Sequence, residues 1–326
     1  MEKLLEERGK IVDEFIEKII QRNKNSVLYD AVWYHLKSGG KRIRPALCLL
    51  TCKLLGGEEK KALPFAAACE LLHSWALIHD DIEDGDTVRR NKPAVWVKYG
   101  LAQGINIGDF LNGKVYECIF KSKEYGIDNE TILKLIKVLT QVVISTTEGQ
   151  AMDINFRSRR DVSEEEYMEM AKKKTGNYLV LPIIGGTIIA GKEEYIETLR
   201  KFGEYIGPAF QIRDDLIDLT EGKGRGEIGC DIKEGKRSLL VIYTASRCNK
   251  EEKEKLYEIL DKPREKTTKQ DIEFVINLFK KYRAFEYAQN KAEGLIREGI
   301  KVIEKLPEEV KNFLESVAVF IVKRKS

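Results

Sequence analysis

Two segments of the chain, Leu63–Leu77 and Tyr178–Ala190, are apolar around nearly the whole circumference of a helix. A helix on a protein surface keeps a polar face toward water, so segments of this kind must be surrounded by other helices. Neither approaches the roughly 18 consecutive apolar residues that a membrane span needs. The sequence therefore predicts a helical bundle in which these two segments lie in the interior.

Helical periodicity continues along most of the chain, whereas the alternating pattern and the Asn-Gly or Asp-Gly turns of β-hairpins are missing. No linker rich in Pro or Ser divides the chain, so we expect one all-α domain over residues 1–326. Pro182 and Pro208 are expected to kink or interrupt their helices. The expected helices are Glu2–Ile20, Pro45–Leu55, Leu63–Asp84, Leu101–Phe120, Thr131–Glu148, Glu164–Ala190, Glu194–Asp218, Ser238–Ser246, Glu251–Leu260, Lys269–Glu304 and Pro307–Lys323.

Acidic residues gather at the ends of two of these helices. In "LIHDDIEDGD" the side chains of Asp80 and Asp84 lie one turn apart on one face, and "FQIRDDLID" repeats this spacing with Asp214 and Asp218. Like charges at this spacing destabilise a helix, and more so when they are buried. A bound cation would neutralise them, and carboxylate oxygens select hard ions such as Mg²⁺. The alternative, a solvated helix end, accounts for one such cluster more easily than for two.

Basic residues flank both acidic clusters. The motif "GGKRIRP" places Lys41, Arg42 and Arg44 just before a helix start, where backbone N–H groups also favour anions. Magnesium held by carboxylates leaves ligand positions open for phosphate oxygens, so the combination predicts a diphosphate substrate. The other basic residues beside the clusters are Arg89, Arg90, Lys174 and Lys236.

The overall charge of the chain is nearly balanced. The net charge is only +3, although 33% of the residues are charged, and this argues against a nucleic-acid-binding protein. The N-terminal "MEKLLEERGK" lacks the apolar core of a signal peptide. We therefore expect a cytoplasmic protein that is not integral to a membrane.

Together these segments resemble the trans-isoprenyl diphosphate synthases (polyprenyl synthases), and specifically the short-chain archaeal type. The matching motifs occur in the family's order, from Gly39 to Ser238: "GGKRIRP", "CELLHSWALIHDDIEDGDTVRRNKP", "GDFL", "EGQAMD", "KKKTGNYL", "FQIRDDLID" and "GCDIKEGKRS". The resemblance implies an all-α bundle around a deep central cavity, usually as a homodimer. It implies the head-to-tail joining of isopentenyl diphosphate to an allylic diphosphate.

The resemblance also implies roles for individual residues. About three Mg²⁺ ions would be bound with the allylic diphosphate by Asp80, Asp81 and Asp84 of the first motif and by Asp214, Asp215 and Asp218 of the second. Arg89, Lys174 and Lys236 would assist the allylic diphosphate; Lys41, Arg44, His73 and Arg90 would bind isopentenyl diphosphate; Thr175 and Gln211 match positions near the reacting carbons.

Product length depends on the residues just before the first motif. In the resembled family bulky side chains there form the floor of the hydrocarbon pocket, and Trp75 stands five residues before Asp80 with Ala76 beside it and Leu72 one turn deeper. Trp75 lies about 7–8 Å below the acidic residues along the helix axis. The expected product is geranylgeranyl diphosphate, with farnesyl diphosphate next. The alternative for Trp75 is ordinary core packing.

The chain departs from the family pattern at a few positions. Asn91 replaces a common Gly, the equivalent of a loop lysine is either Lys223 or Arg225, and His79 is expected to have a structural role or to support the metal ligands. A class I terpene cyclase, a non-catalytic subunit of a heteromeric prenyl synthase and a helical scaffold protein are the alternatives. The second aspartate motif and "GGKRIRP" argue against a terpene cyclase, and the presence of both aspartate motifs argues against a non-catalytic subunit.

Overall fold

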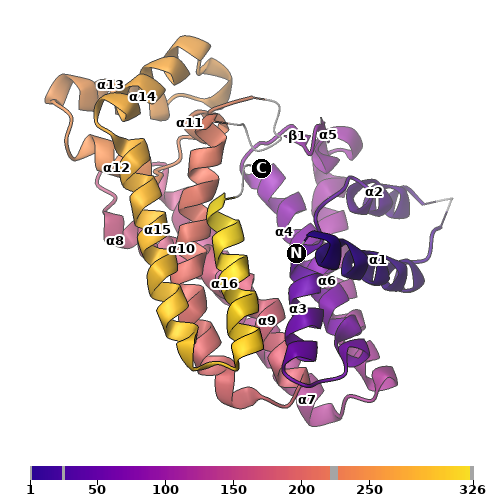
Figure 1. The fold of residues 1–326 in the computed structure, drawn as a ribbon. Helices are drawn as coiled ribbons and strands as arrows, with labels where there is room; N and C mark the ends of the chain where they lie inside the picture. The colour runs from indigo at the N-terminus through magenta and orange to yellow at the C-terminus, as the bar shows by residue number, and fades with distance from the viewer. Residues whose placement is uncertain (1, 24–25, 221–226, 324–326) are drawn as a thin grey trace. The chain divides into compact units, whose positions relative to one another are not determined.

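The computed structural model describes residues 2–23, 26–220 and 227–323 (Figure 1). Within these ranges the secondary structure is helical except for a pair of two-residue strands, β1 (Val88–Arg89) and β2 (Lys92–Pro93). The prediction of an all-α fold is confirmed. The chain divides into two compact units, with residues 1–141, 180–199 and 306–310 in unit 1 and the rest in unit 2. A single domain stays a prediction.

Unit 1 is built around α4 (Leu63–Glu83), which packs against α3 (Ile43–Leu54) and α6 (Leu101–Lys121). Every residue of α4 from Pro64 to Leu72 is buried, as the all-round apolar pattern predicts. Phe65 of this segment packs against the backbone of Gly185. The other elements of unit 1 are α1 (Glu2–Ile19), α2 (Val27–Leu36), η1 (Glu59–Ala62), α5 (Val95–Tyr99), η2 (Ser122–Tyr125) and η4 (Glu193–Tyr195).

Four helices contribute residues to both units: α7 (Asn129–Phe156), α9 (Asn177–Ile189), α10 (Ile196–Thr220) and α16 (Glu308–Lys323). Helix α9 is buried over almost its whole length, which confirms the second interior segment. Both α9 and α10 continue through their prolines, Pro182 and Pro208, so these residues do not interrupt the helices, and a kink at each stays a prediction. None of the described helices has the length and apolar composition to cross a membrane.

Unit 2 is organised around α10 and α8 (Glu164–Ala171). Helix α8 begins with a capping box, in which Ser163 and Glu166 bind each other's backbone N–H groups, and it runs into a π-helical turn, η3 (Lys172–Gly176). Figure 1 shows α15 (Ala284–Val302) beside α10, where Gly299 faces Ile206. The other elements are α11 (Cys230–Lys233), α12 (Leu239–Ala245), α13 (Lys250–Leu260), η5 (Arg264–Lys266), α14 (Lys269–Lys281) and η6 (Ile303–Lys305).

The expectation of one continuous helix over Lys269–Glu304 is wrong at one point. Helix α14 ends at Lys281 and α15 begins at Ala284, and between them Arg283 has a φ of 58°. The left-handed region is sterically unfavourable for arginine, and a helix break of this kind is usually marked by glycine or asparagine. The sequence around Arg283 therefore gave no sign of the break. The sequence patterns also missed α2 and α5, which are short.

Candidate active site

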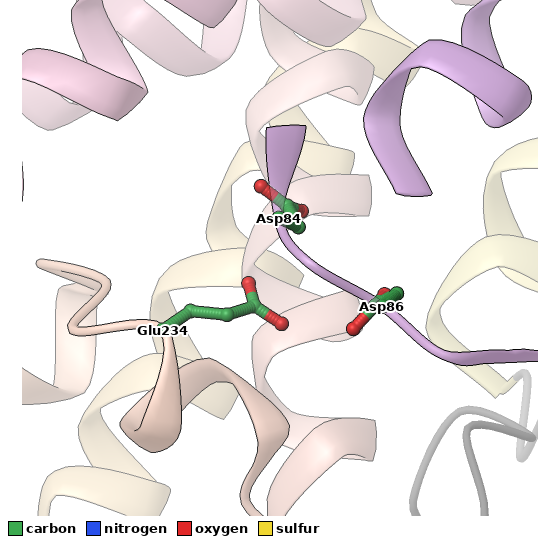
Figure 2. Close-up of side chains that lie close together, drawn as sticks. All are labelled: Asp84, Asp86 and Glu234. Atoms are coloured by element: carbon green, nitrogen blue, oxygen red, sulfur yellow. The ribbon is translucent and has the colours of Figure 1, made fainter. Parts of the chain in front are cut away.

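The first acidic motif lies at the end of α4 in unit 1. Asp80 and Asp81 occupy the last turn, and the backbone N–H of Asp84 donates to the carbonyl of Asp80 at 2.9 Å. Beyond the helix, the backbone N–H of Asp86 donates to the carbonyl of Asp81 at 2.8 Å. Figure 2 shows Asp84 and Asp86 just past the helix end, with a carboxylate oxygen of each within 4.8 Å of the other. Glu234, also drawn there, belongs to unit 2. The turn after α4 thus gathers additional carboxylates.

Arg89, at the end of β1, turns back onto the same cluster. Its Nε donates to Oδ1 of Asp81 at 2.7 Å, and its Nη2 forms an ion pair with that carboxylate. The same Nη2 lies 3.5 Å from Oδ2 of Asp80 and 3.6 Å from Oδ2 of Asp86. One guanidinium therefore faces three carboxylates.

Asp81 is the most strongly perturbed member of the cluster. Burial raises the pKa of its carboxyl to about 7; the Arg89 guanidinium lowers this pKa, and the charges of Asp80 and Asp86 raise it. Its Oδ2 is buried and accepts no hydrogen bond from the described residues. An added cation would favour the ionised carboxylate, and oxygen donors of this type suit Mg²⁺. The residues at the end of α4 therefore fit a hard divalent cation.

The β1–β2 hairpin positions two arginines. Its central residues, Arg90 and Asn91, have φ values of 53° and 59°. A tight hairpin turn of the I′ type needs positive φ at both central positions, which asparagine adopts more readily than most residues. Asn91 thus fills the position of the family's glycine without loss of the turn. The turn lets Nη1 of Arg90 donate to Oγ of Ser38 at 3.2 Å and to the carbonyl of Gly39.

Three of the four residues expected at the isopentenyl diphosphate site, Arg44, His73 and Arg90, interact electrostatically in unit 1. Gly40 has a φ of 132°, and a Cβ there would lie 2.9 Å from Nη2 of Arg90, so glycine permits this close approach. Burial, followed by the charges of Arg44 and Arg90, holds the pKa of His73 well below its usual value. His73 is therefore neutral at neutral pH. Lys41 directly follows Gly40, and its side chain is exposed.

Arg42, from the same motif, is bound into the fold. Its Nε donates to Asp13 of α1 at 2.8 Å and its Nη1 to Glu70 of α4 at 2.9 Å. Its Nη2 donates to the carbonyl of Leu36 at the end of α2, also at 2.8 Å. These partners hold α1, α2 and α4 around the start of α3. The sequence pattern alone could not separate Arg42 from Lys41, its neighbour.

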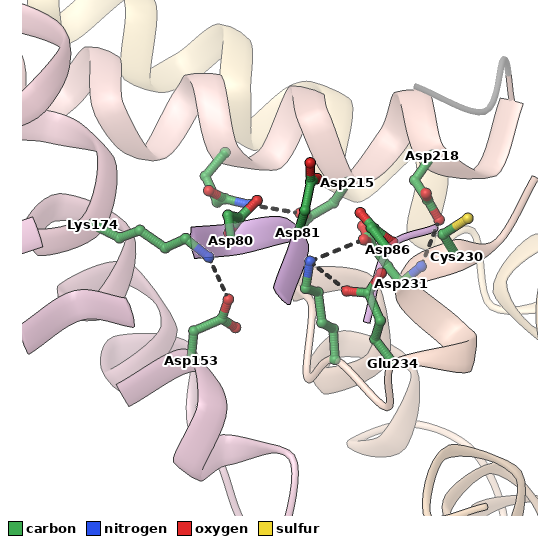
Figure 3. Close-up of polar contacts among 12 residues, drawn as sticks. Asp80, Asp81, Asp86, Asp153, Lys174, Asp215, Asp218, Cys230, Asp231 and Glu234 are labelled. Carbon is green, nitrogen blue, oxygen red and sulfur yellow. Dashed lines mark hydrogen bonds and ion pairs between the residues drawn. The ribbon is translucent and has the colours of Figure 1, made fainter. Parts of the chain in front are cut away.

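The second acidic motif lies on α10 in unit 2. Asp215 and Asp218 are buried, and Asp214 is half-buried. Oδ2 of Asp218 accepts the backbone N–H of Asp231 at 3.0 Å, which ties α11 to α10 (Figure 3). Oδ2 of Asp215 accepts a hydrogen bond from the hydroxyl of Tyr167 at 2.8 Å. Tyr167 carries no local sequence signal, because its partner lies 48 positions away in the chain.

Both lysines expected at the allylic diphosphate are bound by carboxylates of unit 2 (Figure 3). Nζ of Lys174 donates to Asp153 at 2.7 Å. Nζ of Lys236 lies 3.2 Å from Asp231 and 2.7 Å from Glu234. Sequence reasoning did not name these three acids, although each stands in a motif quoted above: Asp153 ends "EGQAMD", and Asp231 and Glu234 belong to "GCDIKEGKRS". The acids fix the direction of each ammonium group.

The structure joins Gln211 and Thr175, which were expected near the reacting carbons. The Thr175 hydroxyl lies 3.1 Å from Oε1 of Gln211, and the contact links the π-helical turn η3 to α10. Such π turns within helices are frequent at functional sites. Lys223 and Arg225, the two candidates for the loop cation, lie outside the described residues.

The chain-length candidates lie on α4, before the first acidic motif. Leu72 is buried, and Trp75 and Ala76 are half-buried. Trp75 contacts the ring of His79 edge to face, with 5.6 Å between ring centroids. His79 in turn lies 3.4 Å from the carbonyl of Ile105 in α6, which is consistent with a structural role. Trp75 and His79 therefore share one stripe of α4.

Comparison with known proteins adds independent information. The polyprenyl synthetase family profile matches residues 25–279. A short chain isoprenyl diphosphate synthase of Methanothermobacter thermautotrophicus is 36% identical over 326 residues, covering 98% of each chain. A geranylgeranyl diphosphate synthase of Sulfolobus acidocaldarius is 37% identical over 84% of this chain and 82% of its own. A geranylfarnesyl diphosphate synthase of Aeropyrum pernix is 34% identical over 89% and 92% of the two chains.

The fold agrees with these relatives. The crystal structure of geranylgeranyl pyrophosphate synthetase from Pyrococcus horikoshii superimposes with a TM-score of 0.88, at 35% identity, over 98% of this chain and 97% of the other. The family match extends over most of the chain and confirms the resemblance inferred from the motifs. The chain belongs to the polyprenyl synthetase family and is a prenyltransferase of the kind that makes short-chain prenyl diphosphates.

Proposed function

We propose that this protein catalyses the Mg²⁺-dependent, head-to-tail condensation of isopentenyl diphosphate with an allylic diphosphate to give geranylgeranyl diphosphate. The observation that carries the proposal is the group of three carboxylates, two of them buried, that Arg89 contacts at the end of α4. Such a group suits a metal-bound diphosphate, and the family relationship supplies the reaction class. The names of two similar proteins support the C20 product.

The proposed Mg²⁺ ligands are Asp80, Asp81 and Asp84 in unit 1 and Asp214 and Asp218 in unit 2. The resemblance implies Asp215 as a further ligand; because its two oxygens accept hydrogen bonds from Tyr167 and Gln211, we assign it instead a supporting role. About three ions would accompany the allylic diphosphate. Magnesium bound there would stabilise the pyrophosphate leaving group.

In this proposal, basic side chains of the protein bind both diphosphates. In this proposal Lys174 and Lys236 stabilise negative charge on the allylic leaving group, together with Arg89. Both lysines are held in place by acids before substrate binds, so little reorganisation is needed.

Isopentenyl diphosphate binds in this proposal to Lys41, Arg44, His73 and Arg90. Because His73 is neutral, it contributes a hydrogen bond and no charge. Thr175 and Gln211 lie near the reacting carbons, where the allylic cation forms. The apolar helices of the bundle keep water from this cation.

We also propose that the protein is a homodimer. The side chains of Leu101, Ile105 and Phe120 on α6 are 53%, 45% and 61% exposed, and Leu133 on α7 is 65% exposed. Exposed apolar residues on long helices suit a subunit interface. Sedimentation equilibrium at micromolar concentration should give twice the 37.4 kDa chain mass. An active monomer would refute the dimer.

The test of the function is an assay of the purified protein with labelled isopentenyl diphosphate and geranyl or farnesyl diphosphate. Dephosphorylated products are separated by chromatography, with and without a chelator. The expected result is a C20 alcohol that disappears when Mg²⁺ is removed; a C15 end product would identify a farnesyl diphosphate synthase. Release of a hydrocarbon from the allylic substrate alone would indicate a terpene cyclase, and the absence of any product would contradict the proposal.

A further inference from the structure

Three hydrogen bonds in unit 2 form a chain that includes Asp215 of the second acidic motif. Tyr167 donates its hydroxyl to Oδ2 of Asp215 at 2.8 Å. Nε2 of Gln211 donates to Oδ1 of the same carboxylate at 3.0 Å. The hydroxyl of Thr175 donates to Oε1 of Gln211 at 3.1 Å. Each oxygen of Asp215 thus accepts one hydrogen bond, and the carboxylate links Tyr167 to Gln211 and Thr175.

The direction of this chain follows from the groups that meet in it. Nε2 of Gln211 is the atom that faces Asp215, and an amide nitrogen can only donate. The side-chain carbonyl of Gln211 then faces Thr175, and the threonine hydroxyl must donate its single proton to that carbonyl. The Thr175 oxygen consequently has only lone pairs left to offer to any other group.

Tyr167 is the buried end of the chain. It is only 1% exposed on α8, whereas Thr175 and Gln211 belong to η3 and α10. The backbones of η3 and α10 approach so closely that a Cβ on Gly207 would overlap Gly176. This close packing sets the register between Thr175 and Gln211, which lies one turn after Gly207.

The phenol of Tyr167 also lies among the acids that hold the two lysines. Burial and then the charge of Asp215 raise the pKa of Tyr167 well above its usual value, with smaller contributions from Asp153 and Asp231. Those two acids bind Lys174 and Lys236. Tyr167 therefore stays a neutral hydrogen-bond donor to Asp215.

We propose that Tyr167 is a positioning residue for prenyl transfer: through Asp215 it fixes the amide of Gln211 and so turns the lone pairs of Thr175 outward, toward positive charge that develops on the substrate. The inference rests on the proposed function, which places Thr175 and Gln211 beside the reacting carbons. Tyr167 itself touches neither substrate. If Tyr167 only supports folding, removing its hydroxyl should change stability and leave kcat unchanged. If it positions Gln211, removing the hydroxyl should lower kcat.

The test compares the steady-state kinetics of Tyr167→Phe with those of the wild type in the complete assay. Because the substitution removes one oxygen and leaves the ring, it should lower kcat about tenfold and change neither KM by more than about twofold. The matched control is Tyr287→Phe, which removes a hydroxyl bonded to Glu164 at 2.6 Å elsewhere in unit 2. The control should keep the wild-type kcat.

A double-mutant cycle separates positioning from simple destabilisation. If Tyr167 acts through Gln211, adding Tyr167→Phe to Gln211→Met should produce no further fall in kcat. An unchanged kcat in the single variant, or the same fall in both backgrounds, would overturn the proposal. Wild-type protein that makes no prenyl diphosphate would instead contradict the function itself, so the two failures are distinguishable.

If Tyr167→Phe shows no cooperative thermal transition, Asp215→Asn replaces it, because the amide keeps the volume of the carboxyl but not its acceptor-only character. The expected result is a reduced kcat with an unchanged half-saturating Mg²⁺ concentration. A raised Mg²⁺ requirement would make Asp215 a metal ligand and would overturn its role as a link between Tyr167 and Gln211.

Discussion

The guanidinium of Arg42 lies 2.9 Å from the carboxylate of Glu70, a side chain that is only 4% exposed and 28 positions away in the chain. Glu70 is buried, so its charge is tolerable only because Arg42 is there. The same motif, "GGKRIRP", thus contains a structural arginine between residues proposed to bind substrate.

Arg42→Ala should destabilise the fold strongly. The substitution leaves the buried carboxylate of Glu70 without this partner and releases Asp13, so the free energy of unfolding should fall by about 3–5 kcal/mol. Urea denaturation followed by circular dichroism measures the change. Lys37→Ala, which alters an exposed lysine at the end of α2, is the control and should stay near wild type. Wild-type stability of Arg42→Ala would show that the ion pair does not stabilise the protein.

Lys41→Ala should act on substrate binding instead of stability. The Lys41 side chain is exposed, so its removal takes little packing from the core. We expect the KM for isopentenyl diphosphate to rise roughly tenfold or more, and the KM for the allylic substrate to rise much less. Initial rates at varied concentrations of each substrate decide. An equal rise in both constants would contradict the assignment of Lys41 to isopentenyl diphosphate.

Asp80→Ala and Asp214→Ala should each reduce turnover by about two to three orders of magnitude, because each removes a group proposed to hold Mg²⁺ at the leaving group. Circular dichroism should show that the helical fold is kept. Glu298→Gln serves as the control, since that carboxylate is 52% exposed on α15 and belongs to none of the motifs. If both alanine variants keep near-normal turnover, the metal sites are misassigned.

Acid should destabilise the protein through His35. This side chain is 2% exposed, and burial, followed by the charges of Arg90, Arg89 and Arg42, lowers its pKa to about 3. Between that value and the ordinary 6.5, the unfolded chain binds a proton that the folded chain does not. This contribution to stability is complete above the ordinary pKa and is lost as the pH falls toward the lowered one.

The measurement is the free energy of unfolding at several pH values for the wild type and for His35→Gln. His35 alone should add a slope of up to about 1.4 kcal/mol per pH unit across that window. Because His73 contributes with the same sign, the difference between the two proteins is the quantity to compare. Parallel curves for both proteins would show that His35 does not titrate in this way.

Trp75→Ala should lengthen the product by one or more C5 units if Trp75 forms the floor of the hydrocarbon pocket. The shortened side chain removes a large half-buried ring from α4 and opens space along the helix. Chromatography of dephosphorylated products measures the length, and Trp33→Phe on α2 is a control that should keep the wild-type product. An unchanged product in Trp75→Ala would make Trp75 an ordinary packing residue, and a wild-type product of C30 or longer would overturn the short-chain assignment.

The sequence by itself determined what depends on neighbours along the chain. Helical periodicity is local, so the interior positions of α4 and α9 could be predicted from their apolar pattern. The same holds for the spacing of Asp80 and Asp84, because residues four apart always share a helix face. The order of the motifs then identified the family before any distance was known.

Only the tertiary structure decided which groups meet across long stretches of chain. Neither the pairing of Tyr167 with Asp215 nor that of Arg42 with Glu70 leaves a local signal, because each partner is an ordinary residue until the helices pack. The same is true of the positive φ values at Arg90 and Arg283, which the sequence pattern disfavours. Such backbone conformations persist where surrounding contacts outweigh their cost, and those contacts exist only in the folded chain.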